Sequence, residues 1–171
     1  MNELDNSVLQ PSILLSWGMV DEIHKRIFRN IRQDNYQPDV IVAIARGGLV
    51  TATHLAYLLS VDQIVSISIR RPGGSEAKDH AISTPILDCD IDITDKVHGR
   101  RVLVVDGAIG TGRTLHTCFS ALALCMPAEI RVAVMAAWSG CPKGADALAS
   151  LNCRTYLGAA FFPWPIFPWE N

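Results

Sequence analysis

The chain has 171 residues, of which 49% are hydrophobic and 19% are charged, and its formal net charge at pH 7 is −2. This length and composition favour a single globular domain, residues 1–171, and exclude a disordered chain. The absence of a basic excess disfavours nucleic-acid binding, and no apolar run is long enough to span a membrane. The polar start lacks a signal peptide and the five cysteines lack paired spacing, so we expect a cytoplasmic protein with reduced thiols.

The first half of the chain alternates between helical and strand patterns. Apolar residues at helical spacing predict a helix over Trp17–Ile31, with Ser16 as its N-cap. A continuous apolar run predicts a buried strand over Val40–Ala45, and Leu49–Leu59 has the pattern of the next helix. The turn between them contains a cation and two glycines, and it suits either an anion site or a purely structural turn: Arg46, Gly47 and Gly48.

A long polar segment follows the third predicted strand, Gln63–Ile69. In a compact domain, a segment of this length usually has a function or closes over a site, so we expect residues 70–99 to form a flexible active-site loop. Arg70 and Arg71 at its start are either phosphate contacts or a solvated charge cluster. Within the segment, four acids alternate with apolar residues and predict a short edge strand with outward-facing acids: Asp88, Asp90, Asp92 and Asp95.

The central motif combines a strand, a glycine-rich turn and the start of a helix. Val102–Val105 is an unbroken apolar run that predicts a strand buried on both faces, and Asp106 follows it directly. Three glycines come next, and Thr114–Leu124 has helical character. Backbone N–H groups in such a turn and at a helix N-terminus hold anions. The candidate phosphate ligands are the residues of this turn: Gly110, Thr111, Gly112, Arg113 and Thr114.

Four interpretations of this turn remain open. It departs from a Walker A motif at Arg113, and from a dinucleotide-binding fingerprint at Leu115, where the third glycine belongs. Asp106 would repel a triphosphate but accepts hydrogen bonds from a ribose diol, so an acid followed by this turn suits a sugar 5-phosphate. The fourth interpretation is an ordinary strand-to-helix turn.

The remaining elements complete an α/β pattern. Strands are predicted over Ile130–Ala136 and Thr155–Ala160, with a short helix over Ala145–Leu151 between them. Alternating strands and helices indicate a mainly parallel sheet, with ligands at the carboxyl ends of the strands, where both glycine turns fall. Residues 161–171 alternate aromatic residues with prolines, which excludes a helix or a central strand. This tail suits a rigid hood that stacks on a flat base, or an apolar segment that packs on the domain or a second subunit.

These motifs resemble those of the type I phosphoribosyltransferases, most closely the xanthine–guanine and hypoxanthine enzymes. The resemblance runs from the Trp17 helix through the Arg46 turn and the Asp106 motif to Trp169 and Glu170. It implies a single-domain fold with a mainly parallel central sheet, flanking helices and a small C-terminal hood. It also implies transfer of phosphoribosyl from phosphoribosyl pyrophosphate to a purine-like base with Mg²⁺ as cofactor, and it favours a homodimer.

The resemblance also implies roles for individual residues. Asp106 would hold the ribose hydroxyls or a water on Mg²⁺, and residues 110–114 would hold the 5-phosphate. Trp164 and Glu170 would contact the base. Pyrophosphate would bind at the first glycine turn: Arg46, Gly47 and Gly48.

Three departures from the family pattern affect catalysis. Gly107 replaces a second acid, which removes a charge-assisted hydrogen bond worth about 1.5–3 kcal/mol. Gly110 replaces an acid/base residue, and loss of such a group typically lowers the rate roughly 10²–10⁴-fold. The lysine expected near Ala137 and Trp138 is absent. Two hypotheses follow: an active enzyme with a divergent choice of base, or a catalytically weak relative that binds a nucleotide.

Overall fold

The computed structural model describes residues 12–70, 86–88 and 93–170. The main sheet consists of β2 (Val40–Ala45), β3 (Ile64–Arg70), β4 (Ile86–Asp88), β5 (Arg101–Ile109), β6 (Glu129–Trp138) and β7 (Thr155–Phe161). The strand order is β4-β3-β2-β5-β6-β7, and every described pairing is parallel except that of β4 with β3. The mainly parallel α/β fold predicted from the sequence is therefore confirmed.

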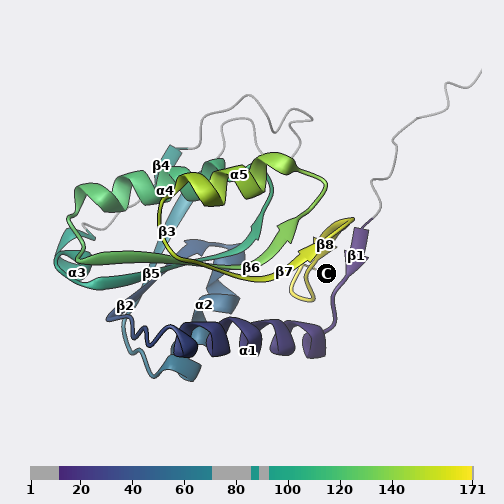
Figure 1. Ribbon diagram of the computed structural model, residues 1–171, viewed down its shortest axis with the longest axis horizontal. Helices are drawn as coiled ribbons and strands as arrows, with labels where there is room; N and C mark the ends of the chain where they lie inside the picture. Colours follow the sequence, from purple (N-terminus) through teal and green to yellow (C-terminus); the bar gives the residue numbers. More distant parts are fainter. Residues whose placement is uncertain (1–11, 71–85, 89–92, 171) are drawn as a thin grey trace, which may run out of the picture.

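Helices cover both faces of this sheet. They are α1 (Trp17–Gln33), α2 (Gly47–Leu59), α3 (Thr94–Val97), α4 (Arg113–Leu124) and α5 (Pro142–Ser150). In Figure 1, α1 and α2 lie on one face, while α4 and α5 lie on the other. Successive residues of β2 alternate between two cores, since Ile41 and Ala43 face the α1 side whereas Val42 and Ile44 face the α4 side. None of the described helices combines the length and apolar character that a membrane crossing needs.

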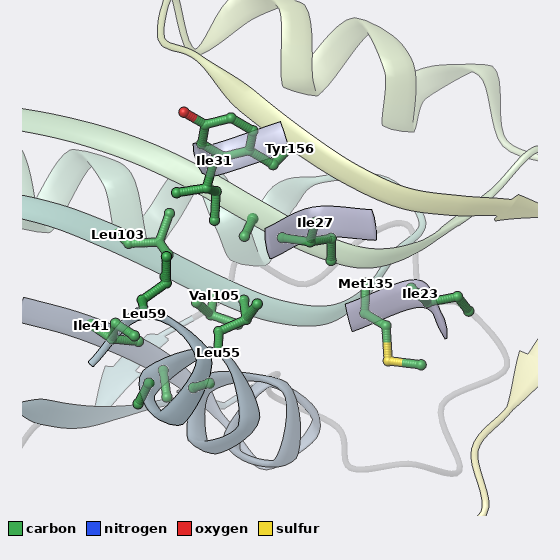
Figure 2. Close-up of a cluster of buried hydrophobic side chains, with 14 of the residues drawn as sticks. Ile23, Ile27, Ile31, Ile41, Leu55, Leu59, Leu103, Val105, Met135 and Tyr156 are labelled. Atoms are coloured by element: carbon green, nitrogen blue, oxygen red, sulfur yellow. The ribbon is translucent and has the colours of Figure 1, made fainter. Parts of the chain in front are cut away.

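The core beneath α1 and α2 fixes these two helices on the sheet. Ile23, Ile27 and Ile31 project from α1 at helical spacing into the core, where Leu55 of α2 and Val105 of β5 also lie (Figure 2). The predicted N-cap is confirmed, because the side chain of Ser16 accepts a hydrogen bond from the backbone N–H of Met19 at 3.2 Å. The helix start and its apolar stripe therefore agree with the sequence pattern.

A buried histidine links α1 to α2. His24 lies with its Nε2 3.1 Å from Oγ1 of Thr51 and its Nδ1 2.8 Å from Nδ1 of His54. Burial, with a smaller contribution from the neighbouring His54, lowers the pKa of His24 to about 4, so the ring is neutral at neutral pH. This contact holds the two helices at a fixed spacing.

Several predicted bounds differ from the observed ones; β6, for example, extends to Trp138 and α5 begins at Pro142, outside the predicted ranges 130–136 and 145–151. The strand predicted to end at Val105 continues to Ile109, because its backbone pairs with β6 past the apolar run. The helix predicted from Leu49 begins at Gly47. The edge strand predicted through four aspartates is wrong at Asp95, which lies in α3, where the 93–97 turn buries Ile93 and Val97 in the second core. Of the other three acids, Asp88 ends β4, and Asp90 and Asp92 lie outside the described residues.

The aromatic tail forms a small sheet of its own. β8 (Trp164–Ile166) pairs in parallel with β1 (Ser12–Leu14), a strand that the sequence pattern does not predict. In Figure 1 this pair lies near the ends of β6 and β7, beside the C-terminus. The tail thus forms neither a helix nor a central strand, as predicted.

Gly158 of β7 allows α1 to approach the sheet closely. An ideal Cβ added there would lie 2.4 Å from Cγ2 of Ile23 and 2.5 Å from the carbonyl oxygen of Met135. We expect Gly158→Ala to lower the free energy of unfolding by about 1–3 kcal/mol, because the methyl group overpacks this contact. Urea unfolding followed by circular dichroism measures the change.

The matched control for this experiment is Gly18→Ala in the first turn of α1. An added Cβ there meets nothing nearer than Oγ of Ser16 at 3.8 Å, and alanine favours a helix. The control should be at least as stable as the wild type. A Gly158→Ala protein of wild-type stability would contradict the close packing.

Candidate functional site

Two glycine turns meet at the carboxyl ends of β2 and β5, which are neighbours in the sheet. Residues 46–48, the 46–48 turn, comprise Arg46 after β2 and the first two residues of α2, and residues 110–112 connect β5 to α4. The Ala45–Arg46 peptide bond is cis, and the side chain of Arg46 is exposed. The sequence prediction that both turns share one edge of the sheet is correct.

The first turn touches the end of β5 through backbone atoms. An ideal Cβ on Gly48 would lie 2.4 Å from the carbonyl oxygen of Val105, and one on Gly107 would lie 2.7 Å from the carbonyl oxygen of Gly47. Neither position has room for a side chain, because the obstructing atoms belong to the backbone. Packing therefore explains the glycine at position 107, since the side chain of a second acid would push the first turn away from β5.

Asp106 stands at this junction as a half-buried carboxylate near the end of β5. Its Oδ1 accepts a hydrogen bond from the backbone N–H of Gly107 at 2.7 Å. Burial raises the pKa of the nearby Cys118 thiol, and the charge of Asp106 raises it further, so this thiol stays protonated and is a poor nucleophile. At this end of β5, the Asp106 carboxylate can therefore accept hydrogen bonds from a ligand, whereas the Cys118 thiol does not act as a nucleophile.

The second turn presents a helix N-terminus. Gly112 has φ of 75°, and α4 begins at the next residue, so the first N–H groups of the helix point toward the turn. An ideal Cβ on Gly112 would lie 2.1 Å from Cβ of Ala147, which shows how tightly α5 covers this residue. The side chain of Arg113 is exposed, and Thr111 and Thr114 are half-buried. Backbone donors, hydroxyls and a cation can together hold a phosphate here.

A cavity of about 840 Å³ lies beside the first turn. Its described lining includes Arg46 and Gly47, Ile69 of β3, and the tail residues Trp169 and Glu170. One Glu170 carboxylate oxygen, Oε2, accepts a hydrogen bond from the backbone N–H of Phe167 at 3.0 Å. The fold thus brings the residues predicted for pyrophosphate and the tail carboxylate predicted for the base to one cavity.

The other predicted site residues are not among the described residues that line this cavity. Arg70 is the last residue of β3, and Arg71 lies outside the described residues, as does most of the 70–99 segment. Trp164 is 37% exposed, and its ring lies against Gly110, where an ideal Cβ would be 3.5 Å from Cζ3. Trp138 lies beside Trp164, although no site role was predicted for it. It packs on Trp164, and its position at the carboxyl end of a strand was the available signal.

The described part of the chain offers no ready-made metal cage. Within it, no group of three or more histidine, cysteine, aspartate or glutamate side chains is placed to hold a metal ion. A divalent cation at Asp106 would therefore need most of its oxygen ligands from a bound phosphate compound and water.

Comparison with protein families and solved structures gives a consistent result. The phosphoribosyl transferase domain model matches residues 14–165. A purine phosphoribosyltransferase from Pyrococcus horikoshii Ot3 has a similar structure, with a TM-score of 0.71, 24% identity and 94% coverage of each chain. A xanthine-guanine-hypoxanthine phosphoribosyltransferase from Helicobacter pylori gives 0.70 at 15% identity, with 94% of this chain and 93% of that chain covered.

A third solved structure shares the fold. It is a hypothetical protein from Neisseria gonorrhoeae with bound ppGpp, with a TM-score of 0.75 and 18% identity over 95% of this chain and 91% of that chain. None of the curated protein sequences compared with the chain matches it. Because the phosphoribosyl transferase domain model matches residues 14–165, nearly the whole chain, the protein belongs to the phosphoribosyltransferase family.

Proposed function

We propose that this protein binds phosphoribosyl pyrophosphate, or a nucleoside 5′-monophosphate, and transfers the phosphoribosyl group to a purine-like base. The observation that carries this proposal is the backbone contact between the 46–48 turn and the end of β5. It places a cationic turn, a carboxylate and the N-terminus of a helix at one edge of the sheet. A ligand with a pyrophosphate, a ribose diol and a 5-phosphate matches these three features in chemistry.

Each part of the site has one role in this proposal. Asp106 accepts hydrogen bonds from the ribose hydroxyls, and the 110–114 turn holds the 5-phosphate through backbone N–H groups and threonine hydroxyls. Arg46 and the backbone of the 46–48 turn bind pyrophosphate, beside the 840 Å³ cavity. Trp164 stacks on the base, with Glu170 at the mouth of the cavity.

Mg²⁺ fits this site as a cofactor that arrives with the substrate. Mg²⁺ commonly takes one or two protein carboxylates and fills its other positions with substrate phosphates and water, and Asp106 supplies one such carboxylate. When bound, the ion would neutralise charge on pyrophosphate. The protein's own contribution is to position the ribose and to provide N–H donors for the phosphates.

The transfer exchanges one bond at C1 of the ribose for another. The bond from C1 to the pyrophosphate oxygen breaks, and its electron pair leaves with pyrophosphate. A nitrogen lone pair of the base forms the new bond to C1, and the proton of that nitrogen passes to solvent. Because Gly110 offers no side-chain base, the reaction suits a base that is already nucleophilic.

A second candidate function is nucleotide binding with weak or no catalysis. Gly107 and Gly110 remove two acids that the family pattern places near the reacting atoms, while the phosphate-binding turns remain. The Neisseria gonorrhoeae fold neighbour holds ppGpp, a guanosine nucleotide, which supports a binding role as an alternative. A measurement of turnover distinguishes phosphoribosyl transfer from nucleotide binding without catalysis.

We also propose a homodimer in the cytoplasm. Large apolar side chains are exposed on α1 and α2, with Trp17 at 59% and Tyr57 at 82% exposure, and such surfaces are commonly covered by a partner. Four described cysteines are free thiols, which supports a reducing compartment: Cys118, Cys125, Cys141 and Cys153.

The first prediction for this function concerns binding and turnover. Calorimetry should show saturable binding of phosphoribosyl pyrophosphate in the presence of Mg²⁺, because both turns are built for anions. Pyrophosphate release with a panel of purines and other bases then tests transfer. Binding without release would support the weak relative, and absence of binding would contradict the proposed transfer.

The second prediction compares the two unusual glycines. Gly107→Ala should weaken binding of phosphoribosyl pyrophosphate by about 5-fold or more, because its Cβ would overpack the backbone of Gly47. Gly110→Asp meets ordinary contact with Trp164, so it should fold and should raise pyrophosphate release by about 10-fold or more. Calorimetry and a pyrophosphate assay measure these effects. Wild-type affinity in Gly107→Ala would contradict the turn contact.

The third prediction concerns assembly. Sedimentation velocity at micromolar concentration should give the mass of two chains. Tyr57→Lys places a charge on the exposed apolar surface and should shift the protein toward the mass of one chain. A wild-type protein that sediments as one chain would contradict the homodimer.

A further inference from the structure

A second cavity, of about 520 Å³, is lined by α1 and α2, which lie on the same face of the sheet (Figure 1). It shares no described lining residue with the 840 Å³ cavity of the proposed site. We call it the interhelix cavity. Its lining is mostly apolar, and three titratable side chains also line it: Asp21, His24 and His54. A cavity of this size with an apolar lining and a few polar groups is typical of a small-molecule site.

A chain of hydrogen bonds fixes the tautomers of the two histidines. The hydroxyl of Thr51 donates its one proton to Sδ of Met135 at 3.4 Å, so it accepts from Nε2 of His24, 3.1 Å away. With its proton on Nε2, His24 accepts at Nδ1 from Nδ1 of His54 at 2.8 Å. The other ring nitrogen of His54, Nε2, is therefore a hydrogen-bond acceptor.

Two acceptor atoms of the interhelix cavity thus lie close together. Nε2 of His54 is 3.9 Å from Oδ1 of Asp21, which is too far for a hydrogen bond. Lys25 binds the other carboxylate oxygen of Asp21, Oδ2, at 2.6 Å. One ligand nitrogen with two N–H groups can lie about 2.8–3.0 Å from both Nε2 and Oδ1, the ordinary length of such hydrogen bonds. The spacing of the two acceptors therefore fits an amine.

The charges of the interhelix cavity favour a positively charged amine. The hydrogen bond from Lys25 lowers the pKa of Asp21, so this carboxylate is ionised at neutral pH. His24 is neutral at that pH and brings no opposing positive charge. Trp17 and Tyr57 add two exposed aromatic rings to the lining, and the faces of such rings attract cations.

We propose that the interhelix cavity binds a small organic amine in its ammonium form. The ammonium group donates to Oδ1 of Asp21 and to Nε2 of His54, and an aromatic or aliphatic body fills the apolar part of the cavity beside Trp17 and Tyr57. A ligand that is only a carboxylate or a phosphate is disfavoured, because Asp21 repels it. This site is separate from the phosphate-binding turns, and the inference does not rest on the proposed transfer.

The test compares two probes of nearly the same shape. Phenethylamine is a cation at neutral pH, and phenethyl alcohol is neutral. Titrations followed by nuclear magnetic resonance should show that the wild type binds the amine about 5-fold or more tightly than the alcohol, because charge-assisted hydrogen bonds are about twice as strong as neutral ones. Asp21→Asn should bring the two affinities to within about 2-fold of each other.

The matched control is Glu22→Gln. Glu22 is the next residue of α1 and also binds Lys25, at 3.3 Å, so this change removes the same charge and a partner of the same lysine. Glu22 lines a different cavity, beside β7, and is not among the described residues of the interhelix cavity. The control should therefore keep the preference for the amine.

Several results would overturn the amine site. They are no binding of the amine at about 10 mM, equal affinities for both probes in the wild type, a preference unchanged in Asp21→Asn, or a preference lost in Glu22→Gln. Nitrogen-15 shifts of the histidine rings at about pH 8 report the tautomers, and a proton on Nε2 of His54 would also contradict it. Trp17 and Tyr57 belong to the face proposed above for the homodimer, so exclusion of the amine by a partner chain counts as failure too.

Discussion

The site depends on one contact, in which the backbone of the 46–48 turn lies directly against the end of β5. Glycines at positions 48 and 107 make the contact possible, because backbone atoms occupy the space that a Cβ would need. The contact fixes the start of α2 against β5 and places Asp106 beside the arginine turn. Position 107 is therefore constrained by packing, and an acid there is incompatible with the close approach of the 46–48 turn to β5.

In the proposed function, the site has two parts, which bind the phosphates and the nucleobase and depend on different structural features. The phosphate-binding part relies on backbone N–H groups, a positive φ at Gly112 and the N-terminus of α4, which persist as long as the sheet and helices keep their positions. The proposed base-binding part relies on a side chain at the start of β8, Trp164, whose ring packs on Trp138 at the end of β6. A change of base therefore needs new side chains at strand ends, while the phosphate cradle can stay as it is.

The sequence predicted the parts of the fold that have a strong local pattern. The bounds of β2 agree with prediction because every residue from Val40 to Ala45 is apolar, whereas β5 runs past Val105 because strand pairing there depends on the backbone of β6. β1 was not predicted, since its partner β8 lies about 150 residues away in the chain. The same limit applies to the contact of Gly47 with Gly107 and to the packing of Trp138 on Trp164, which join residues distant in sequence.

The two ends of the described chain together position Trp164, the ring that we propose to stack on the base. β8 is held by β1, and the ring of Trp169 stacks on Phe167 with planes 2° apart and lies 5.8 Å from Trp17 at the start of α1. Trp164 is thus positioned by β1, by the stack of Phe167 and Trp169, and by the start of α1, and none of these three belongs to the proposed phosphate site. In the proposed function, the sheet positions the phosphate site and the paired ends position the stacking ring, so the distance between these two places would select ligands by the span from 5-phosphate to base. A nucleoside 5′-monophosphate has this span built into its ribose.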